Sequence, residues 1–198
     1  MNIKQDVIYF MEDTYIYINN NSLSKELCDD IIEIYDNSDK KRQSKTIGGL
    51  NTDTLKATSC DCSDISDRKW VDIERCLFNE LMYNLHEYMK QINTTKYTHT
   101  TLYRYCKFRI QKYEKNEMGK YDYHIDELIE NQTARKMTFI WYLNDVYDGG
   151  ETTFYNKKIQ PTVGKILIFP STWTYPHSSL PVISNSKYII VGWLLQDL

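Results

Sequence analysis

Apolar residues recur at helical spacing in two segments of the first half of the chain. In residues 67–92 they stand three or four positions apart, the pattern of an amphipathic helix with one buried face. Leu27, Ile31 and Ile34 show the same spacing in an earlier segment. That segment begins after Ser24, a residue type that favours the N-cap of a helix. The sequence therefore predicts two helices, and we expect both to pack on a sheet.

The second half of the chain has the pattern of short strands. β-branched and aromatic residues gather in runs that turn-forming residues such as Gly149 and Gly150 separate. Many short strands without intervening helices are typical of a β-sandwich or barrel. The predicted strands cover residues 102–110, 136–144, 165–169 and 186–195, with a further short strand at residues 14–18.

The composition predicts one globular domain. The chain has 198 residues, of which 41% are hydrophobic, and it contains no repeat or linker that would mark a second domain. We expect a single domain over residues 1–198, with a helix-rich supporting part (1–95) and a β core that carries the candidate functional residues (96–198). Residues 40–51 are polar and basic and predict a surface loop.

Charge and hydropathy limit the range of possible partners and the expected cellular location. The formal net charge of −3 argues against a dedicated nucleic-acid binder. No apolar run is long enough to cross a bilayer, and the amino terminus lacks the core of a signal peptide. We therefore expect no membrane partner and a cytoplasmic location. The abundance of Ile, Lys, Asn and Tyr suits an A/T-rich genome, such as that of a phage or a low-GC bacterial host.

Three residues are candidate metal ligands. Because side chains two positions apart on a strand share a face, His124 and Asp126 would present an imidazole nitrogen and a carboxylate oxygen together. His177 supplies a third ligand after a strand and a turn. Two histidines and one carboxylate form the facial triad of non-haem Fe(II) oxygenases. The remaining histidines, His86 in the second helix and His99 in a polar stretch, are predicted at the surface.

Lys187 is the candidate anion-binding residue. It lies ten residues after His177 in an otherwise apolar strand, where a buried ammonium calls for an anionic partner such as the far carboxylate of a keto acid. The alternative is that its side chain reaches out to water. Even spacing places Trp193 on the same face as Lys187 and predicts that Tyr142, on another strand, faces the same pocket.

Taken together, these residues resemble the prolyl 4-hydroxylase branch of the Fe(II)- and 2-oxoglutarate-dependent dioxygenases. The resemblance extends over most of the chain, including two helical segments, the strand and hairpin that precede the distal histidine, and the closing strands. It departs at Tyr188, where the family often has tryptophan, and at Ser178 and Ser179, where the family commonly has glycine. The matching segments are residues 22–34, 72–77, 135–145, 149–152 and 164–169, followed by His177, Pro181, Val182, Lys187 and Trp193.

The resemblance implies a fold, a set of cofactors and roles for individual residues. The fold would be α+β with a mainly β core, a double-stranded β-helix (jelly roll, cupin-like) with the N-terminal helices packed on its major sheet. The cofactors would be Fe(II), 2-oxoglutarate and O2, with ascorbate as a reductant, and no catalytic residue is implied beyond the metal centre. The implied metal ligands are His124, Asp126 and His177, and the implied 2-oxoglutarate contacts are Lys187, Tyr142 and Tyr113.

The resemblance also implies a substrate. Arg135 and Trp193 match positions near a substrate, and the implied reaction is hydroxylation of peptidyl proline in a peptide or protein partner, with release of succinate and CO2. Three alternatives stay open. The chain would instead hydroxylate a free amino acid or another small molecule, serve as a cupin-like binding module without turnover, or demethylate nucleic acid, for which the basic segment 40–51 is the support. In each enzymatic case, this segment would close over the substrate.

Overall fold

The computed structural model describes residues 15–92, 104, 105 and 107–198. Within these residues there are two α-helices, α1 (Lys25–Asn37) and α2 (Arg68–Gln91), and two short 3-10 helices, η1 (Cys62–Asp64) and η2 (Lys115–Glu117). The strands are β1 (Tyr17–Asn19), β2 (Arg42–Gln43), β3 (Thr58–Asp61), β4 (Arg104–Tyr105), β5 (Arg109–Tyr113), β6 (Tyr121–His124), β7 (Ile129–Glu130), β8 (Thr133–Tyr142), β9 (Thr152–Thr153), β10 (Lys158–Ile159), β11 (Ile166–Pro170), β12 (His177–Ser179) and β13 (Lys187–Asp197).

Both predicted helices are confirmed, together with their starting points. The Ser24 side chain accepts a hydrogen bond from the backbone N–H of Leu27 at 3.2 Å and caps α1. The Asp67 side chain accepts one from the backbone N–H of Lys69 at 2.8 Å and caps α2. Such caps satisfy N–H groups that have no partner inside the helix. The apolar face of α2 is buried as its spacing predicted, at Trp70, Ile73, Leu77, Leu81, Leu85 and Tyr88.

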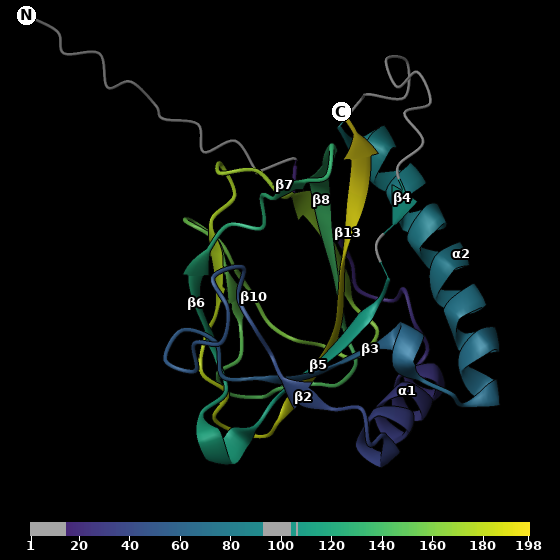
Figure 1. The fold of residues 1–198 in the computed structure, drawn as a ribbon, viewed down its shortest axis with the longest axis vertical. Coiled ribbons are helices and arrows are strands. Elements are labelled where there is room, and N and C mark those ends of the chain that lie inside the picture. Colours follow the sequence, from purple (N-terminus) through teal and green to yellow (C-terminus); the bar gives the residue numbers. More distant parts are fainter. Residues whose placement is uncertain (1–14, 93–103, 106) are drawn as a thin grey trace, which may run out of the picture.

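The strands form two antiparallel sheets. The major sheet has the order β1-β11-β8-β13-β5-β3-β2, with β4 beside β13 and β7 beside β8. The minor sheet has the order β10-β9-β12-β6. The two helices lie on one side of the major sheet, and the strands of the minor sheet lie on the other side (Figure 1). This is the predicted double-stranded β-helix with helices against its major sheet, and the fold prediction is confirmed.

The helix side of the major sheet is a continuous apolar core. Phe139, Trp141 and Ile190 are fully buried there and belong to one cluster with the inner faces of α1 and α2. Gly192 of β13 packs directly against this core, because a Cβ at this position would collide with the ring of Phe139. The alternation of strand side chains therefore sends one set of residues to the helices and leaves the other set for the space between the sheets.

The first half of the chain contributes more to the sheet than its helical pattern indicated. β3 pairs with β5 along its whole length, and β2 pairs with β3, so two strands from the supporting part extend the major sheet. The prediction of a plain surface loop at residues 40–51 is therefore partly wrong. Arg42 and Gln43 form β2, and a bridge between Thr46 and Gly49 closes a tight turn. These strands were not predicted, because their residues are mostly polar and their pairing partners are far away in the chain.

Most of the other predicted elements are found with small shifts in their bounds. The predicted strands at residues 136–144, 165–169 and 186–195 correspond to β8, β11 and β13. His86 is exposed on α2 as predicted, whereas His99 and part of the strand predicted at residues 102–110 lie outside the described residues. In the part of the chain that the structure describes, no helix has the length and apolar character needed to span a membrane.

Candidate metal centre

The three predicted ligands converge at one point between the sheets. His124 is the last residue of β6, Asp126 follows two residues later, and His177 is the first residue of β12. β6 and β12 are antiparallel neighbours, and His124 and His177 are directly paired in their register. One ligand atom from each of the three side chains lies within 4.8 Å of the other two. The triad is thus assembled by strand pairing across a gap of more than fifty residues.

Backbone carbonyl groups orient both imidazole rings. His124 Nδ1 lies 2.8 Å from the carbonyl oxygen of Asp122, and His177 Nδ1 lies 3.1 Å from that of Tyr175. Because a carbonyl oxygen can only accept, each Nδ1 carries the proton and donates it. The Nε2 atoms then remain as ligand atoms, and they lie 3.7 Å and 3.6 Å from the Asp126 carboxylate oxygens. In this tautomer each Nε2 lone pair is available to a metal ion.

The Asp126 carboxylate is buried and held in place. β6 ends at His124, so Asp126 lies on a loop, and a 2.7 Å hydrogen bond from Thr138 Oγ1 to Asp126 Oδ2 positions it. Burial acts to raise the pKa of Asp126, but His177, His124 and the Thr138 hydrogen bond outweigh this effect and hold the pKa below its ordinary value. Burial and the neighbouring His177 lower the pKa of His124 to about 4. An ionised carboxylate and a neutral imidazole are the forms that bind a metal ion.

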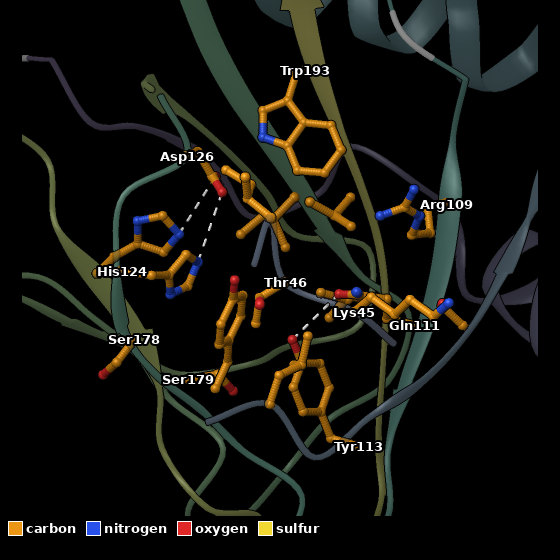
Figure 2. Close-up of a pocket in the computed structure, with 18 of the residues that line it drawn as sticks. Lys45, Thr46, Arg109, Gln111, Tyr113, His124, Asp126, Ser178, Ser179 and Trp193 are labelled. Atoms are coloured by element: carbon orange, nitrogen blue, oxygen red, sulfur yellow. Dashed lines mark hydrogen bonds and ion pairs between the residues drawn. The ribbon is translucent and has the colours of Figure 1, made fainter. Parts of the chain in front are cut away.

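A cavity of about 470 Å³ leads from this cluster into the space between the sheets. Figure 2 shows Asp126 between the indole of Trp193 and the imidazole of His124, with Tyr113 and Ser179 further along the pocket. Ile140 and Tyr142 of β8 line the cavity together with four residues of β13. The even spacing in the sequence predicted this shared face, and the prediction is confirmed: the β13 residues are Lys187, Ile189, Val191 and Trp193.

Lys187 lies deep in the cavity and is 1% exposed, so its side chain does not reach out to bulk water. Its ammonium donates hydrogen bonds to the Gly150 carbonyl oxygen at 2.7 Å and to Ser179 Oγ, and it lies 4.4 Å from the centre of the Tyr113 ring. Burial lowers the pKa of Lys187 to about 7, and the charge of Glu151 opposes this shift. All the atoms that accept its hydrogen bonds among the described residues are neutral, which leaves the ammonium without a carboxylate in contact.

Tyr142 and Tyr113 flank this lysine on neighbouring strands. Both side chains are buried, and burial raises the pKa of each phenol. The Tyr142 hydroxyl donates to Thr152 Oγ1 at 2.5 Å, and the Tyr113 hydroxyl donates to Gln111 Oε1 at 3.3 Å. The structure therefore brings both tyrosines to the deep end of the cavity, each with a protein partner for its hydroxyl.

Arg135 and Trp193 meet at the outer end of the cavity. The guanidinium carbon of Arg135 lies 3.7 Å from the centre of the Trp193 ring, a close cation–π stack. Arg135 Nη1 also donates to the carbonyl oxygen of Asp126 at 3.4 Å. Both residues line the cavity. The eight residues singled out in the sequence are thus all brought to one cavity, with the lysine and tyrosines at one end and the arginine and tryptophan at the other.

Three neighbours of the triad were not assigned a role from the sequence. Tyr121 stacks on His124 with 3.5 Å between ring centres, Thr138 holds Asp126, and Ser179 accepts from Lys187. Strand alternation places Thr138 on the pocket side, but no sequence pattern indicates which group its hydroxyl would bind. Tyr121 stands three residues before His124, a spacing at which a side chain is expected on the other strand face. A bulge in the β6 and β12 pairing accompanies its different position.

The fold and the site define a class of protein. A double-stranded β-helix that holds two imidazoles and one carboxylate at a common point has the donor set of a non-haem Fe(II) oxygenase. Residues 108–195, which carry the three ligands and Lys187, match the family model of the 2OG-Fe(II) oxygenase superfamily. The resemblance read from the sequence is confirmed.

Curated relatives agree with this match, and solved structures agree with the fold. The chain is 31% identical over 87 residues to a PKHD-type hydroxylase from Synechococcus sp. (strain CC9902), covering 40% of this chain and 38% of that relative. It therefore spans less than two thirds of the length of the curated relatives that it matches. A prolyl hydroxylase from Trichoplax adhaerens, solved with a peptide fragment of hypoxia inducible factor, has a TM-score of 0.70 at 18% identity, with 93% of this chain and 84% of that chain covered.

A second solved structure has the same fold. The viral collagen prolyl hydroxylase of Paramecium Bursaria Chlorella virus-1, in its 2OG complex, has a TM-score of 0.64 at 20% identity, with 92% of this chain and 96% of that chain covered. At these identities the structural likeness speaks for the fold alone.

Proposed function

We propose that this chain is an Fe(II)- and 2-oxoglutarate-dependent dioxygenase that hydroxylates peptidyl proline and releases succinate and CO2, with residues 1–198 acting as one domain. The observation that carries the proposal is the presence of two groups in one cavity. One is the cluster of His124, Asp126 and His177, and the other is the deeply buried cation of Lys187.

The donor set fits Fe(II). His124 Nε2, His177 Nε2 and an Asp126 oxygen would hold the ion on one side and leave its other side to the cavity. When bound, Fe(II) together with 2-oxoglutarate and O2 supplies the oxidation of a substrate C–H bond. The protein's own part is to keep the ligands in place. The carbonyl groups that accept from each Nδ1 fix the rings, and Thr138 fixes the carboxylate.

Lys187 would bind the far carboxylate of 2-oxoglutarate. Its ammonium is already oriented by Gly150 and Ser179, and an arriving carboxylate would favour the charged form of a lysine whose pKa burial lowers to about 7. Tyr142 and Tyr113 line the same end and would serve as further contacts, the Tyr142 hydroxyl turning from Thr152 to the ligand. A charge-assisted hydrogen bond in this buried position is a strong one.

Arg135 and Trp193 would face the substrate at the outer end. The flat indole presents an apolar surface on which a pyrrolidine ring packs well, and the stacked guanidinium holds the indole in place. The peptidyl substrate is supported by the likeness to prolyl hydroxylases, one of which was solved with a peptide fragment. A pocket open to the surface also leaves room for the chain on either side of a proline.

The proposal is tested by an anaerobic titration followed by turnover. Adding Fe(II) and then 2-oxoglutarate under argon should give the weak visible absorbance band of the iron and keto acid complex. After air is admitted, a proline-containing peptide should increase succinate release and gain the mass of one oxygen atom. Turnover with free proline but not with peptides would favour the small-molecule alternative, and absence of any succinate would favour a binding module. Ascorbate, as the proposed reductant, should extend the number of turnovers.

A further inference from the structure

We infer that the outer end of the pocket binds a carboxylate on the substrate, so that the preferred peptide carries an acidic residue beside the reacting proline. This inference rests on the proposed function and names the substrate class for the same site. Its basis is a set of positively charged side chains that the proposed metal and 2-oxoglutarate do not contact. These charges form an outer basic cluster that consists of Arg42, Lys45, Arg109 and Arg135, all of which line the cavity.

The cluster makes the pocket positive although the chain as a whole is negative. The formal net charge is −3. Among the described residues that line the cavity, the acidic ones are Asp126, which belongs to the metal cluster, and the exposed Glu130. Positive charge is thus gathered at the mouth of the cavity, on residues from β2, the turn after it, β5 and β8. A cleft lined mainly by one sign of charge raises the local concentration of ligands of the opposite sign.

The protein neutralises this cluster only in part. Asp61 accepts from both Arg42 and Arg109, and Asp64 pairs with Arg42 at 3.2 Å. Arg109 uses its Nε for this pair at 2.7 Å. Its two Nη groups have no protein acceptor among the described residues, and Figure 2 shows its guanidinium pointing into the pocket. Within the described part of the chain, Lys45 likewise has no acidic partner. Donors therefore remain for a ligand.

The cosubstrate does not account for these donors. Lys187 lies on β13, and the metal ligands His124 and His177 lie on β6 and β12. Trp193 pairs with Thr138, which bonds the metal ligand Asp126, so the metal cluster lies toward the Trp193 end. A small dicarboxylate that joins Lys187 to the metal therefore lies over β13, whereas Arg42 and Lys45 come from β2 and the turn after it, three strands away in the major sheet. The anion expected there belongs to the second substrate.

A peptide carboxylate fits this end better than a phosphate backbone. The mouth is also lined by the apolar side chains of Ile47, Ile125 and Leu128, and it includes the acidic Glu130. Nucleic-acid surfaces are more uniformly basic, and they extend along a stripe rather than around the mouth of one cavity. The guanidinium of Arg109 also lies 5.8 Å from the ring centre of Trp193, so the donors and the proposed proline platform adjoin each other.

The test uses three labelled peptides that share one proline-containing sequence and carry Glu, Gln or Lys on both sides of the proline. Binding to the full chain, loaded anaerobically with Fe(II) and 2-oxoglutarate, is measured by fluorescence anisotropy. We expect the Glu peptide to bind about tenfold more tightly than the Gln peptide, and this advantage to shrink as salt is added. The Lys peptide should bind most weakly.

Two variants and a control assign the preference to the cluster. Lys45→Gln and Arg109→Gln should each reduce the ratio of Glu to Gln affinity several-fold, and the exposed Lys158→Gln on β10, away from the cavity, should leave it unchanged. Lys45 has no partner in the described structure, so its variant stays informative if loss of the Asp61 pair disturbs the Arg109 variant. Equal affinity for the three peptides would overturn the inference, as would tighter binding of a short single-stranded DNA than of the Glu peptide.

Turnover separates this inference from the proposed function. If the charge preference is seen in binding but no peptide supports succinate release, the inference stands and the prolyl hydroxylase function fails. If all three peptides are hydroxylated with equal efficiency and bind equally, the function stands and the inference fails.

Discussion

The two faces of strands β8 and β13 have different roles. On the helix side, Phe139, Trp141 and Ile190 are completely buried, and even the indole N–H of Trp141 has a partner, Ser22 Oγ at 3.0 Å. On the pocket side, the same strands present Lys187, whose ammonium has only neutral acceptors among the described residues, and Arg135, which stacks on Trp193. One face of each strand therefore stabilises the fold, and the other is left ready for ligands.

Residues that stabilise the fold and residues that bind ligands can therefore alternate along a single strand. Neighbouring residues of a strand point to opposite faces, so a substitution at one position reaches the helix core and a substitution at the next reaches the pocket. A buried amide on the helix side is satisfied by the protein itself. Asn84, fully buried on α2, accepts from Tyr17 and Asn19 and donates to Ser22. Changes on the two faces should therefore affect different measurements.

The largest expected effect is on the pocket side, at Asp126. Asp126→Ala removes the carboxylate ligand and should lower Fe(II) affinity and turnover by at least about a hundredfold. Fe(II) binding is measured by anaerobic titration and turnover by succinate release. The exposed neighbour Glu127→Ala is the matched control and should behave like the parent protein. An Asp126→Ala protein that still bound Fe(II) normally would contradict the proposed site.

Lys187→Met should chiefly weaken cosubstrate binding. It removes the buried cation while keeping an unbranched apolar side chain of nearly the same length, and we expect the dissociation constant of 2-oxoglutarate to rise about a hundredfold with Fe(II) binding unchanged. Lys165→Met is the control because Lys165 is also buried but lies outside the cavity, where it donates to the Gln160 carbonyl oxygen. The parental affinity for 2-oxoglutarate in the Lys187 variant would remove this residue from the binding site.

On the helix side, Asn84→Ala should cost stability without changing the chemistry. The substitution leaves several buried donors and acceptors without partners, and we expect the free energy of unfolding to fall by about 2–3 kcal/mol. Urea unfolding measures this loss, and the 2-oxoglutarate requirement should stay the same. The exposed Asn79→Ala on the same helix should change stability by less than about 0.5 kcal/mol. A changed requirement for 2-oxoglutarate in Asn84→Ala would show that the two faces are coupled.

The effect with the smallest change per step concerns folding, because the burial of Lys187 makes stability depend gradually on pH. The pKa of Lys187 is lowered to about 7 in the folded protein, whereas an unfolded lysine titrates near 10.4. Between these values the unfolded chain binds the proton and the folded chain does not, so the free energy of unfolding should rise with pH. The slope is at most about 1.4 kcal/mol per pH unit.

Lys187→Met isolates this contribution. The difference in unfolding free energy between the variant and the parent protein, both without ligands, should be largest near pH 7 and should shrink toward pH 10. Urea unfolding at several pH values measures it. A difference that stays constant over this range would mean that Lys187 keeps its proton in the folded protein.

Much of the site was readable from the sequence because its elements are regular. The shared face of His124 and Asp126 and the even spacing from Lys187 to Trp193 follow from local periodicity, and the cap at Ser24 follows from its residue type. β2 and β3 were missed because polar residues join a sheet only through partners distant in the chain. The role of Ser179 escaped for the same reason, since its hydroxyl matters only beside Lys187.

Which side chains share a strand face, and which residue types can bind a metal and an anion, could be predicted from the sequence. Strand alternation and ligand chemistry are local properties, set by residues close together in the chain. The tertiary structure alone decided that His177 pairs with His124, that Thr138 holds Asp126, and that cations from β2, β5 and β8 gather at one mouth. Those contacts join residues far apart in sequence, and long-range strand pairing brings them together.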